Sequence, residues 1–591
     1  MFCLAGTEIH NAAEQETIIV SASRIEMPIS ASLNDVLVIS RDDIEISQAD
    51  SLVELLSASA GLDLIRKGGA GQESSIFIRG ANANHLLIVI DGVRVGSATL
   101  GLKALSDISL AQIESIEIIK GPRAALWGSQ AIGGVLQIFT RQQDHQSIQI
   151  TTGSSGYKGL VYGAGFKSQA LNGSITYQQT KLSGIDTRFD LDPDTDGAKR
   201  EHFNLNGSYL IDPNQTLKLL IQNDQGNTEF DTAWGGDQLD FNNQIYSLSY
   251  LWNNNNWQHQ IQLNQHQDSS ITHGQSTLPV TFETSSQSVT WLIENKPSDH
   301  WTIGTSLEWQ RDDIGNSDTL YNQSERNTLA AHLYSHYQSQ DWINELAIRH
   351  TNMDGLASNN AIHFGLGYRF SAQQLLSINF GEGFKAPTFN DLYFPFGGNE
   401  NLNHETSDNL EIVYKQSFDI GQLSLTIFDN DIKNLIQWIP DSQGVWAPQN
   451  VGESNQQGID LSVQWQALEM QHKLTAGYVD AVDLNTQTKL QLRASEQAAY
   501  QVSGFIDKAK HWSTLVQVKY VGKRPDVDYQ SYLPIEHQSY IQTDLAVQYD
   551  FNNNWRLGLR VNDIFNNQGI YVSGFRPEGR SFRLSLNYLG N

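Results

Sequence analysis

The sequence lacks most of the features that stabilise small secreted domains or anchor helical membrane proteins. Its 591 residues include one cysteine, Cys3, so an internal disulfide framework and a cysteine-based zinc site are both excluded. No run of 18 apolar residues occurs, which excludes a transmembrane helix. Basic residues number 38 against 65 acidic ones, a net charge of −27. This balance argues against nucleic acid as a partner, because phosphate binding needs clusters of Lys and Arg.

Motifs for catalysis are missing as well. No Ser-His-Asp arrangement, HExxH or glycine-rich phosphate loop occurs in a convincing context, and the 16 histidines are scattered. The chain is therefore predicted not to be an enzyme. Its acidic balance is compatible with a surface that faces water and divalent cations.

The first 140 residues or so mix short helical and strand signals. SLVELLSASAGLDL (51–64) predicts an amphipathic helix closed by Gly61. SSIFIRG, HLLIVIDGVRV and IESIEIIKGP predict short buried strands that end at glycine. Together these signals indicate a compact mixed α/β domain.

Beyond about residue 145 the pattern changes to strict alternation. In Trp555–Asn562 every odd position is apolar and every even position is polar or glycine. Phe582–Tyr588 and Leu545–Phe551 alternate between two faces in the same way. Because successive side chains of a strand point to opposite faces, each segment is predicted to be a strand with one apolar and one more polar face.

Several features favour a membrane barrel over a soluble sandwich. The segments run to roughly ten residues, about the length that crosses a bilayer when tilted. Their polar faces are rich in Asn, Gln, Ser and Arg, which suits a hydrated lumen. Roughly 450 residues at about 20 per strand and turn predict about 22 antiparallel strands, a size that holds a plug. Aromatic residues often end the segments, as an interfacial girdle requires: Trp252, Trp291, Tyr368, Tyr520, Tyr549 and Tyr588.

Several motifs resemble those of TonB-dependent outer-membrane receptors. SSIFIRGANANHLLIVIDGVRV and IESIEIIKGPRAALWGSQAIGGVLQIFT resemble the plug of that family, and GFKAPTFNDLY, GNENLNHE, NVGESNQQGID and NDIFNN resemble its barrel. The resemblance implies an all-β transmembrane barrel in a Gram-negative outer membrane, with an N-terminal mixed α/β plug domain inside its lumen. The implied divisions are a leader remnant or disordered N-terminus (1–15), a TonB box (16–22), the plug (23–141) and the transmembrane barrel (142–591).

The TonB box is an extended segment rich in β-branched residues. Such a segment is suited to adding a strand to a partner, because backbone hydrogen bonds supply the affinity. An outer membrane has no ATP or ion gradient of its own, and the resemblance implies that TonB, driven by its inner-membrane complex, acts on this box. The segment consists of Glu16, Thr17, Ile18, Ile19, Val20, Ser21 and Ala22. In the plug, Arg79 and Arg123 resemble arginines that pair with carboxylates of the barrel wall.

Residues 190–197, DLDPDTDG, place four carboxylates in eight positions. The last six fit the start of an EF-hand loop, D-x-D-x-D-G, but the twelfth position, which needs a bidentate Glu, is Phe203, and no helix flanks the loop. Taken alone, the stretch could be a charged hairpin tip. The next strand pair carries a second acidic tip, with Asp231 and Asp240, and loops at the same end of neighbouring hairpins lie side by side.

This pair of acidic loops resembles the calcium-binding loops of the cobalamin receptors within the family. There, two extracellular loops bind a pair of Ca²⁺ ions that order them before the corrinoid docks. A hard cation that takes about six to eight oxygens relieves the repulsion between neighbouring carboxylates. Position 192 departs from those receptors, which have Gln there. The ligands that the resemblance implies are Asp186, Asp192, Asp194, Asp196, Asp231, Asp240 and the backbone carbonyl of Phe230.

GGAGQESSIFIRG (68–80) resembles the plug loop that faces the cargo in the same receptors. Gln72, Ser74 and Ser75 are retained, whereas Glu73 replaces an apolar residue and Lys67 replaces an Asn. Side chains of Ser, Asn, Gln and Tyr can hydrogen-bond the amide arms of cobalamin while apolar groups pack on its ring. The cargo contacts that the resemblance implies are Glu73, Ser75, Asn82, Leu100, Gly101, Thr232, Arg493 and Tyr529.

We therefore expect TonB-dependent transport of cobalamin or a related corrinoid, with Ca²⁺ as a structural ion. The alternative is a receptor for a ferric siderophore or another metal chelate, in which the acidic loops are only structural. An adhesin without transport would need no TonB box. The expected partners are TonB, the lipid and lipopolysaccharide of the outer membrane, and a periplasmic cobalamin-binding protein.

Overall fold

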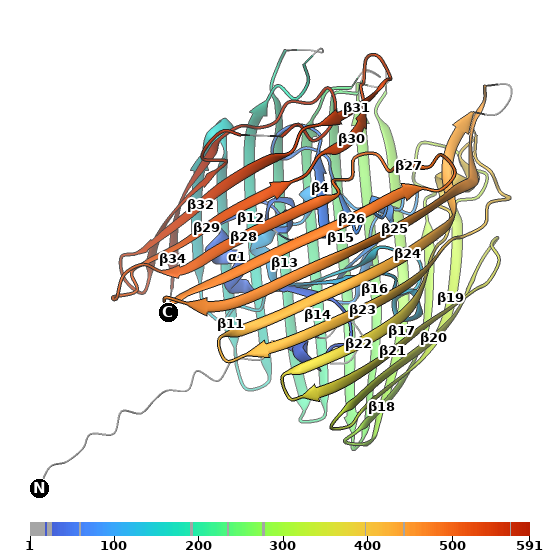
Figure 1. The fold of residues 1–591 in the computed structure, drawn as a ribbon, viewed down its shortest axis with the longest axis horizontal. Coiled ribbons are helices and arrows are strands. Elements are labelled where there is room, and N and C mark those ends of the chain that lie inside the picture. Colours follow the sequence, from blue (N-terminus) through green and yellow to red (C-terminus); the bar gives the residue numbers. More distant parts are fainter. Residues whose placement is uncertain are drawn as a thin grey trace, which may run out of the picture.

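A large barrel of long strands encloses a smaller domain (Figure 1). The computed structural model describes residues 18–19, 27–57, 59, 61–189, 193–232, 236–274, 278–395, 397–440, 444–567 and 569–590. No helix in these ranges is long and apolar enough to cross a membrane.

The alternating segments form a closed antiparallel barrel, which in the described part of the chain has 22 strands. It closes because β10 pairs with β34, with Ile150 opposite Leu586. The strands are β10 (Ser147–Gly153), β11 (Lys158–Lys167), β12 (Leu171–Ile185), β13 (Asp196–Asp212), β14 (Gln215–Glu229), β15 (Gln238–Asn254), β16 (Trp257–His273), β17 (Val280–Ser298), β18 (Trp301–Asp313), β19 (Glu325–Gln338), β20 (Trp342–Met353), β21 (Asn359–Ser371), β22 (Gln374–Lys385), β23 (Glu405–Phe418), β24 (Gly421–Pro440), β25 (Trp446–Ala467), β26 (Met470–Asp483), β28 (Glu496–Phe505), β29 (Trp512–Val521), β32 (Tyr540–Asp550), β33 (Trp555–Asn562) and β34 (Ser581–Leu589). The two-residue strand β27 (Thr488–Lys489) pairs antiparallel with the last residues of β26.

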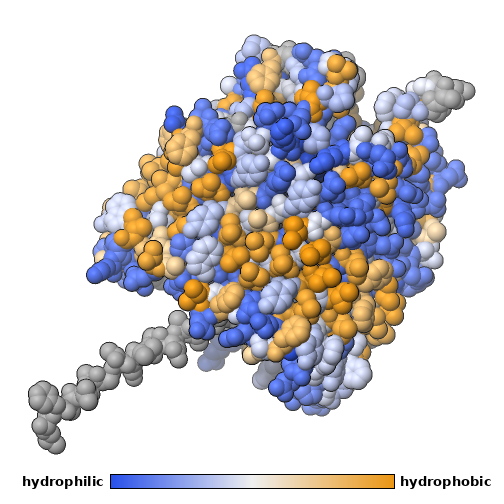
Figure 2. All heavy atoms as spheres, in the orientation of Figure 1, coloured by the Kyte–Doolittle hydropathy of each residue, from blue (hydrophilic) through white to orange (hydrophobic). Residues whose placement is uncertain are grey.

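Alternate side chains along each strand face the interior and the outer surface of the barrel. On β19, Leu329 and Leu333 are more than half exposed, whereas His332 between them is 2% exposed and faces the interior. Figure 2 shows the result on one face of the molecule: hydrophobic residues gather in an oblique belt across the barrel wall, with hydrophilic residues beyond both of its edges. The belt is the surface that a bilayer covers, and the predicted all-β transmembrane barrel is confirmed.

The inner domain, the plug, is built on a five-stranded mixed sheet. Its buried aliphatic strands pack with two short helices into one apolar core. Within the sheet, β6 and β9 run parallel. The sheet order is β3 (Val36–Ile39), β8 (Ile113–Lys120), β9 (Gly134–Thr140), β6 (Leu86–Ile90) and β7 (Val93–Val95), accompanied by α1 (Arg41–Ser47), α2 (Leu52–Leu56), α3 (Ala124–Trp127) and the hairpin β4 (Leu62–Arg66) with β5 (Ser74–Ile78).

The helix predicted to begin at Ser51 and to be closed by Gly61 is too long. Ser51 caps α2, which ends at Leu56. Leu62–Arg66 instead forms β4, because pairing with β5 gives its backbone a ladder of hydrogen bonds that a longer helix would forgo. The strands predicted from SSIFIRG, HLLIVIDGVRV and IESIEIIKGP are confirmed as β5, β6, β7 and β8.

The plug is fixed to the barrel by buried ion pairs. The Arg79 guanidinium contacts Glu411 on β23 at 3.0 Å and Asp460 on β25 at 2.9 Å. Arg123 contacts the other carboxylate oxygen of Glu411 at 3.1 Å. The predicted pairing of plug arginines with wall carboxylates is confirmed, and it holds the plug in one orientation inside the lumen.

The two ends of the barrel differ in the length of their connections. At one end, tight turns join β13 to β14 and β15 to β16. The opposite end carries longer connections, and we call it the long-loop end. Three of them carry residues of the candidate site: the acidic loop (186–195) between β12 and β13, the connection (230–237) between β14 and β15, and the C-terminal loop (563–580) between β33 and β34. The hairpin β30 (Arg524–Val527) with β31 (Pro534–His537) and the short helix α4 (Phe389–Tyr393) also lie in connections between barrel strands.

Of the predicted TonB box, the described residues are Ile18 and Ile19. They form β1 (Ile18–Ile19), which pairs with β2 (Met27–Pro28). The other five residues of the box, and the predicted leader at 1–15, lie outside the described residues.

Candidate functional site

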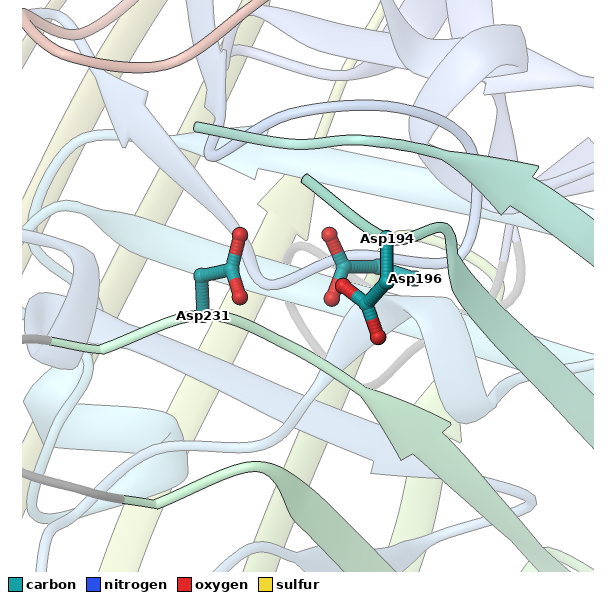
Figure 3. A group of neighbouring side chains, drawn as sticks. All are labelled: Asp194, Asp196 and Asp231. Carbon is teal, nitrogen blue, oxygen red and sulfur yellow. The ribbon is translucent and has the colours of Figure 1, made fainter. Parts of the chain in front are cut away.

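Three aspartates from two neighbouring hairpins converge at the long-loop end. Asp194 lies in the acidic loop just before β13, Asp196 is the first residue of β13, and Asp231 lies two residues after the end of β14. One carboxylate oxygen from each lies within 4.8 Å of the others. Figure 3 shows the Asp231 carboxylate turned toward the other two. These three residues are the acidic cluster. They meet because β13 and β14 are adjacent antiparallel strands whose register sets Ala198 opposite Thr228.

Only some of the carboxylate oxygens of this cluster accept hydrogen bonds. Asp196 is 3% exposed and accepts hydrogen bonds from the backbone N and the Oγ1 of Thr187, at 2.9 and 2.6 Å. The Oδ2 of Asp231 is buried and has no hydrogen-bond partner among the described residues. Burial, followed by the charges of Asp196 and Asp194, raises the pKa of the Asp231 carboxyl to about 6.

The remaining predicted ligands differ in what they contact. Asp186 is close enough for its charge to add to the raised pKa of Asp231, and its own carboxylate is paired with Arg576 at 3.3 Å. Asp240, on β15, pairs with His273 at 2.8 Å. The backbone N of Phe230 donates to the carbonyl of Asp237. Asp192 lies outside the described residues.

The plug reaches the acidic cluster through the tip of the β4–β5 hairpin. Gln72 is 3% exposed and donates from Nε2 to the carbonyl of Glu229, at the end of β14, at 2.8 Å. A Cβ on Gly68 would lie 2.7 Å from Thr187, the residue that donates to Asp196. The tip of the plug and the acidic loop are therefore in direct contact.

Two departures from the cobalamin receptors compensate each other. Lys67 and Glu73 form an ion pair at 2.9 Å across the hairpin tip, with side chains 42% and 65% exposed. Next to them, Ser75 lies in β5 opposite Ile65. Of the cargo contacts predicted on this hairpin, Glu73 is exposed and charged, whereas Ser75 is half-buried.

Asn82 and Arg493, both predicted to contact cargo, contact each other. An Nη2 of Arg493 donates to Asn82 Oδ1 at 2.5 Å, and the guanidinium lies 3.9 Å from the centre of the Phe77 ring. Plug and barrel residues are therefore joined at this point. Elsewhere on the plug, Leu100 is 56% exposed, whereas Gly101 is buried.

Sequence reasoning missed three residues that hold the acidic loops. Glu229 Oε2 accepts from the backbone N of Gly197 at 2.9 Å. The guanidinium of Arg188 lies 5.1 Å from the centre of the ring of Tyr529, a predicted cargo contact. Arg576 reaches Asp186 from a loop nearly 400 positions away. Glu229 and Arg188 border the acidic motifs in sequence, but nothing in the sequence ties Arg576 to them.

Comparison with known families identifies both parts of the molecule. Residues 28–135 match the TonB-dependent Receptor Plug Domain and residues 165–564 match the TonB dependent receptor-like, beta-barrel. The chain belongs to the TonB-dependent receptor family, whose members are transporters and receptors that work with TonB on a transported ligand. It is a protein of the Gram-negative outer membrane, so the long-loop end is extracellular.

Within this family the chain is similar over its length to vitamin B12 transporters. "Vitamin B12 transporter BtuB" of Photobacterium profundum is 30% identical over 587 residues, covering 98% of this chain and 96% of that protein. The protein of the same description from Vibrio cholerae serotype O1 (strain M66-2) is 27% identical over 601 residues, covering 98% and 96%.

Solved structures with the same fold include siderophore receptors. The siderophore receptor PirA from Acinetobacter baumannii superposes with a TM-score of 0.81 at 16% identity, covering 94% of this chain and 98% of that one. A mutant of the ferric enterobactin receptor PfeA from Pseudomonas aeruginosa gives a TM-score of 0.80 at 17% identity, covering 94% and 98%. At these identities the likeness concerns the fold alone.

Proposed function

We propose that this receptor carries cobalamin or a related corrinoid across the outer membrane, and that its acidic cluster holds Ca²⁺ to order the extracellular loops. One observation carries the proposal. An acidic cluster assembled from two hairpins lies beside residues, Glu229 and Thr187, that contact the tip of the plug, in a chain similar along its whole length to vitamin B12 transporters.

The donor set of the cluster suits a hard divalent cation. Its three side chains offer only carboxylate oxygens, and one of these, Asp231 Oδ2, is buried without a partner in the described part of the chain. Calcium, when bound, would neutralise charges that otherwise repel one another. Asp194, Asp196 and Asp231 would hold one ion. A second ion would draw on Asp186, Asp192, Asp240 and the carbonyl of Phe230.

The exposed groups of the plug suit a large amide-bearing cargo with an apolar ring. Leu100 and Leu102 are 56% and 39% exposed at the apex of the plug, where they would pack against the ring. Lys67 can donate to an amide carbonyl, and Glu73 can accept from an amide N–H. Because an exposed ion pair is worth only about 0–1 kcal/mol, these two residues can part at little cost. Ser75, Asn82, Thr232, Arg493 and Tyr529 would supply further polar contacts.

A metal chelate is the second candidate cargo. The Lys67–Glu73 pair places both signs of charge on the plug rim, where the cobalamin receptors have an apolar and an amide residue. A charged chelate would be recognised by one member of this pair, and the acidic cluster would then be a structural feature of the loops.

Titration of the purified receptor with cyanocobalamin and with a ferric catecholate siderophore distinguishes the two. We expect saturable binding of cyanocobalamin at one site and none of the siderophore. Saturable binding of the siderophore without binding of cyanocobalamin would establish that the protein is a receptor for a metal chelate.

Transport would follow from coupling between this site and the TonB box. Cargo bound above the plug would expose residues 16–22 to the periplasm, and TonB would pull on the plug through an added strand. A periplasmic cobalamin-binding protein would then receive the cargo.

A further inference from the structure

The acidic loop is fastened to the C-terminal loop of the barrel. The backbone N of Arg576 donates to the carbonyl of Thr187 at 2.9 Å, and the backbone N of Phe189 donates to the carbonyl of Gly574 at 3.3 Å. Arg188 and Phe575 form an isolated antiparallel bridge between the two. Two loops almost 400 residues apart in sequence therefore pair along a short stretch of backbone.

The Arg576 side chain is directed at the acidic loop by three contacts. Its Nη2 lies 3.3 Å from Asp186 Oδ2, and its Nε donates to the carbonyl of Arg188 at 3.0 Å. Its guanidinium lies 5.0 Å from the centre of the Phe189 ring. The side chains of Arg576 and Asp186 are 40% and 20% exposed, so water and ions can reach this pair.

Other residues hold the fastening in place. The Arg188 guanidinium lies 5.1 Å from the Tyr529 ring and 5.0 Å from the Phe575 ring. The backbone N of Tyr529 donates to Ser573 Oγ in the C-terminal loop at 3.3 Å. Three extracellular connections thus support one another beside the acidic cluster, and Arg576 contributes the positive charge that meets Asp186.

We propose that Arg576 is a built-in countercation of the acidic site, which neutralises Asp186 when no divalent cation is bound and competes with the cation for that carboxylate. This inference rests on the proposed cation site and adds a positioning residue that sets its affinity. Each carboxylate that coordinates a divalent ion adds to the binding free energy. Arg576 keeps the Asp186 carboxylate in an ion pair and also repels the divalent ion. The receptor would keep its loops assembled without the cation and bind the cation with moderate affinity.

The test is Ca²⁺ affinity of the full-length receptor in detergent, measured by isothermal titration and by competition with Tb³⁺ luminescence. Arg576→Gln removes the charge and keeps a polar side chain. We expect it to bind Ca²⁺ about fivefold more tightly, the upper end of the worth of one exposed ion pair. Arg576→Lys should stay within about twofold of the wild type, because it restores the charge.

Two further variants isolate the cause. Arg580→Gln alters an arginine of the same loop that contacts Asn566 and the carbonyl of Ile564, and it should leave Ca²⁺ affinity unchanged. In an Asp186→Asn background, Arg576→Gln should no longer change Ca²⁺ affinity, because the carboxylate for which Arg576 and Ca²⁺ compete is absent.

The sign of the change decides the outcome. If Arg576 only braced the loop, Arg576→Gln would weaken Ca²⁺ binding and increase hydrogen exchange at residues 187–189. Weaker or unchanged Ca²⁺ affinity therefore overturns the inference while leaving the proposed site intact. Absence of Ca²⁺ binding in the wild type would overturn both.

Discussion

Asp231 lies at the end of β14 and faces the carboxylates of Asp194 and Asp196, and one of its own carboxylate oxygens is buried with no partner among the described residues. A carboxyl in that position keeps its proton to higher pH than usual, because burial disfavours its ionised form and ionisation adds a third negative charge to a crowded site. Because its pKa is about 6, a proton and a cation would compete for the Asp231 carboxylate near that pH.

The resulting prediction concerns the pH dependence of Ca²⁺ binding. Because the pKa is raised, the proton stays bound below about pH 6 and the cation must displace it. Affinity is thus complete above that pH and falls as pH drops through it, by up to about tenfold per unit when one proton is exchanged. Calorimetric titration between about pH 7.5 and about pH 5 measures the slope. An Asp231→Asn variant should bind more weakly with a flatter profile, and an equally flat profile in the wild type would contradict the assignment.

At the scale of elements, the site depends on the contact between the β4–β5 hairpin and the acidic loop. Gly68 occupies the tip with φ of +101°, and its α-carbon faces Thr187 with no room for a side chain. Thr187 in turn donates to Asp196. The plug and the acidic cluster are therefore connected through two residues.

Gly68→Ala tests this connection. The added methyl group would meet Thr187 at 2.7 Å and push the acidic loop away from the plug. We expect Ca²⁺ and cobalamin affinities to fall together, by about tenfold, with the barrel intact, because a strained φ and one clash cost about 1–3 kcal/mol. Binding titrations on both ligands measure the effect.

Gly444→Ala is the matched control, since Gly444 also has positive φ (+82°) but no described atom lies within 4 Å of the added carbon. It should leave both affinities unchanged. Equal behaviour of the two variants would show that the hairpin tip and the acidic loop act independently.

The sequence predicted those elements whose pattern is local. Alternation in Trp555–Asn562 matches β33 residue for residue, because one face meets lipid and the other meets the lumen. The helix predicted to end at Gly61 was too long, because α2 ends at Leu56 and the chain then leads into β4, which pairs with a strand that the local sequence cannot specify. Patterns of period two are strong in a barrel, whereas a short plug element is decided by its neighbours.

The acidic cluster could be predicted in outline only. Asp194, Asp196 and Asp231 meet because adjacent hairpins carry them, which the order of strands already implies. Arg576 could not be placed, because its approach depends on closure of the barrel between β10 and β34. The pairing of Asp240 with His273 depends on the register of β15 with β16, which the sequence does not fix.

For the whole molecule, the plug must be held firmly and still be released. Buried ion pairs around Arg79 hold it to β23 and β25, whereas a cavity of about 420 Å³ separates other parts of the plug from the wall formed by β13 to β20.

Arg79→Met should loosen the plug strongly. The substitution removes the buried cation that Glu411, Asp460 and Asp35 share. Breaking a buried ion network in this way costs about 3–5 kcal/mol. Urea unfolding of the plug, monitored through a fluorescent label attached to the plug, should occur at a lower urea concentration. Arg311→Met removes an exposed pair with Glu325 and should change little. An unchanged plug transition in Arg79→Met would show that the network is not what retains the plug.

Deleting residues 16–22 separates binding from transport. The site lies at the extracellular end, and the box is proposed to act only through TonB. We expect uptake of labelled cyanocobalamin by cells to fall to background while the purified variant binds it with wild-type affinity. Loss of both would mean that the segment supports the fold of the plug, and uptake that persists would show that the box lies elsewhere.

The central claim, a corrinoid site ordered by calcium, is tested most directly by cyanocobalamin binding to the purified receptor with Ca²⁺ and with EDTA. The account predicts tight binding with Ca²⁺ and clearly weaker binding with EDTA, restored when Ca²⁺ is returned in excess. Binding that EDTA leaves unchanged would contradict the role of Asp194, Asp196 and Asp231. Absence of binding in both conditions would contradict cobalamin as the cargo.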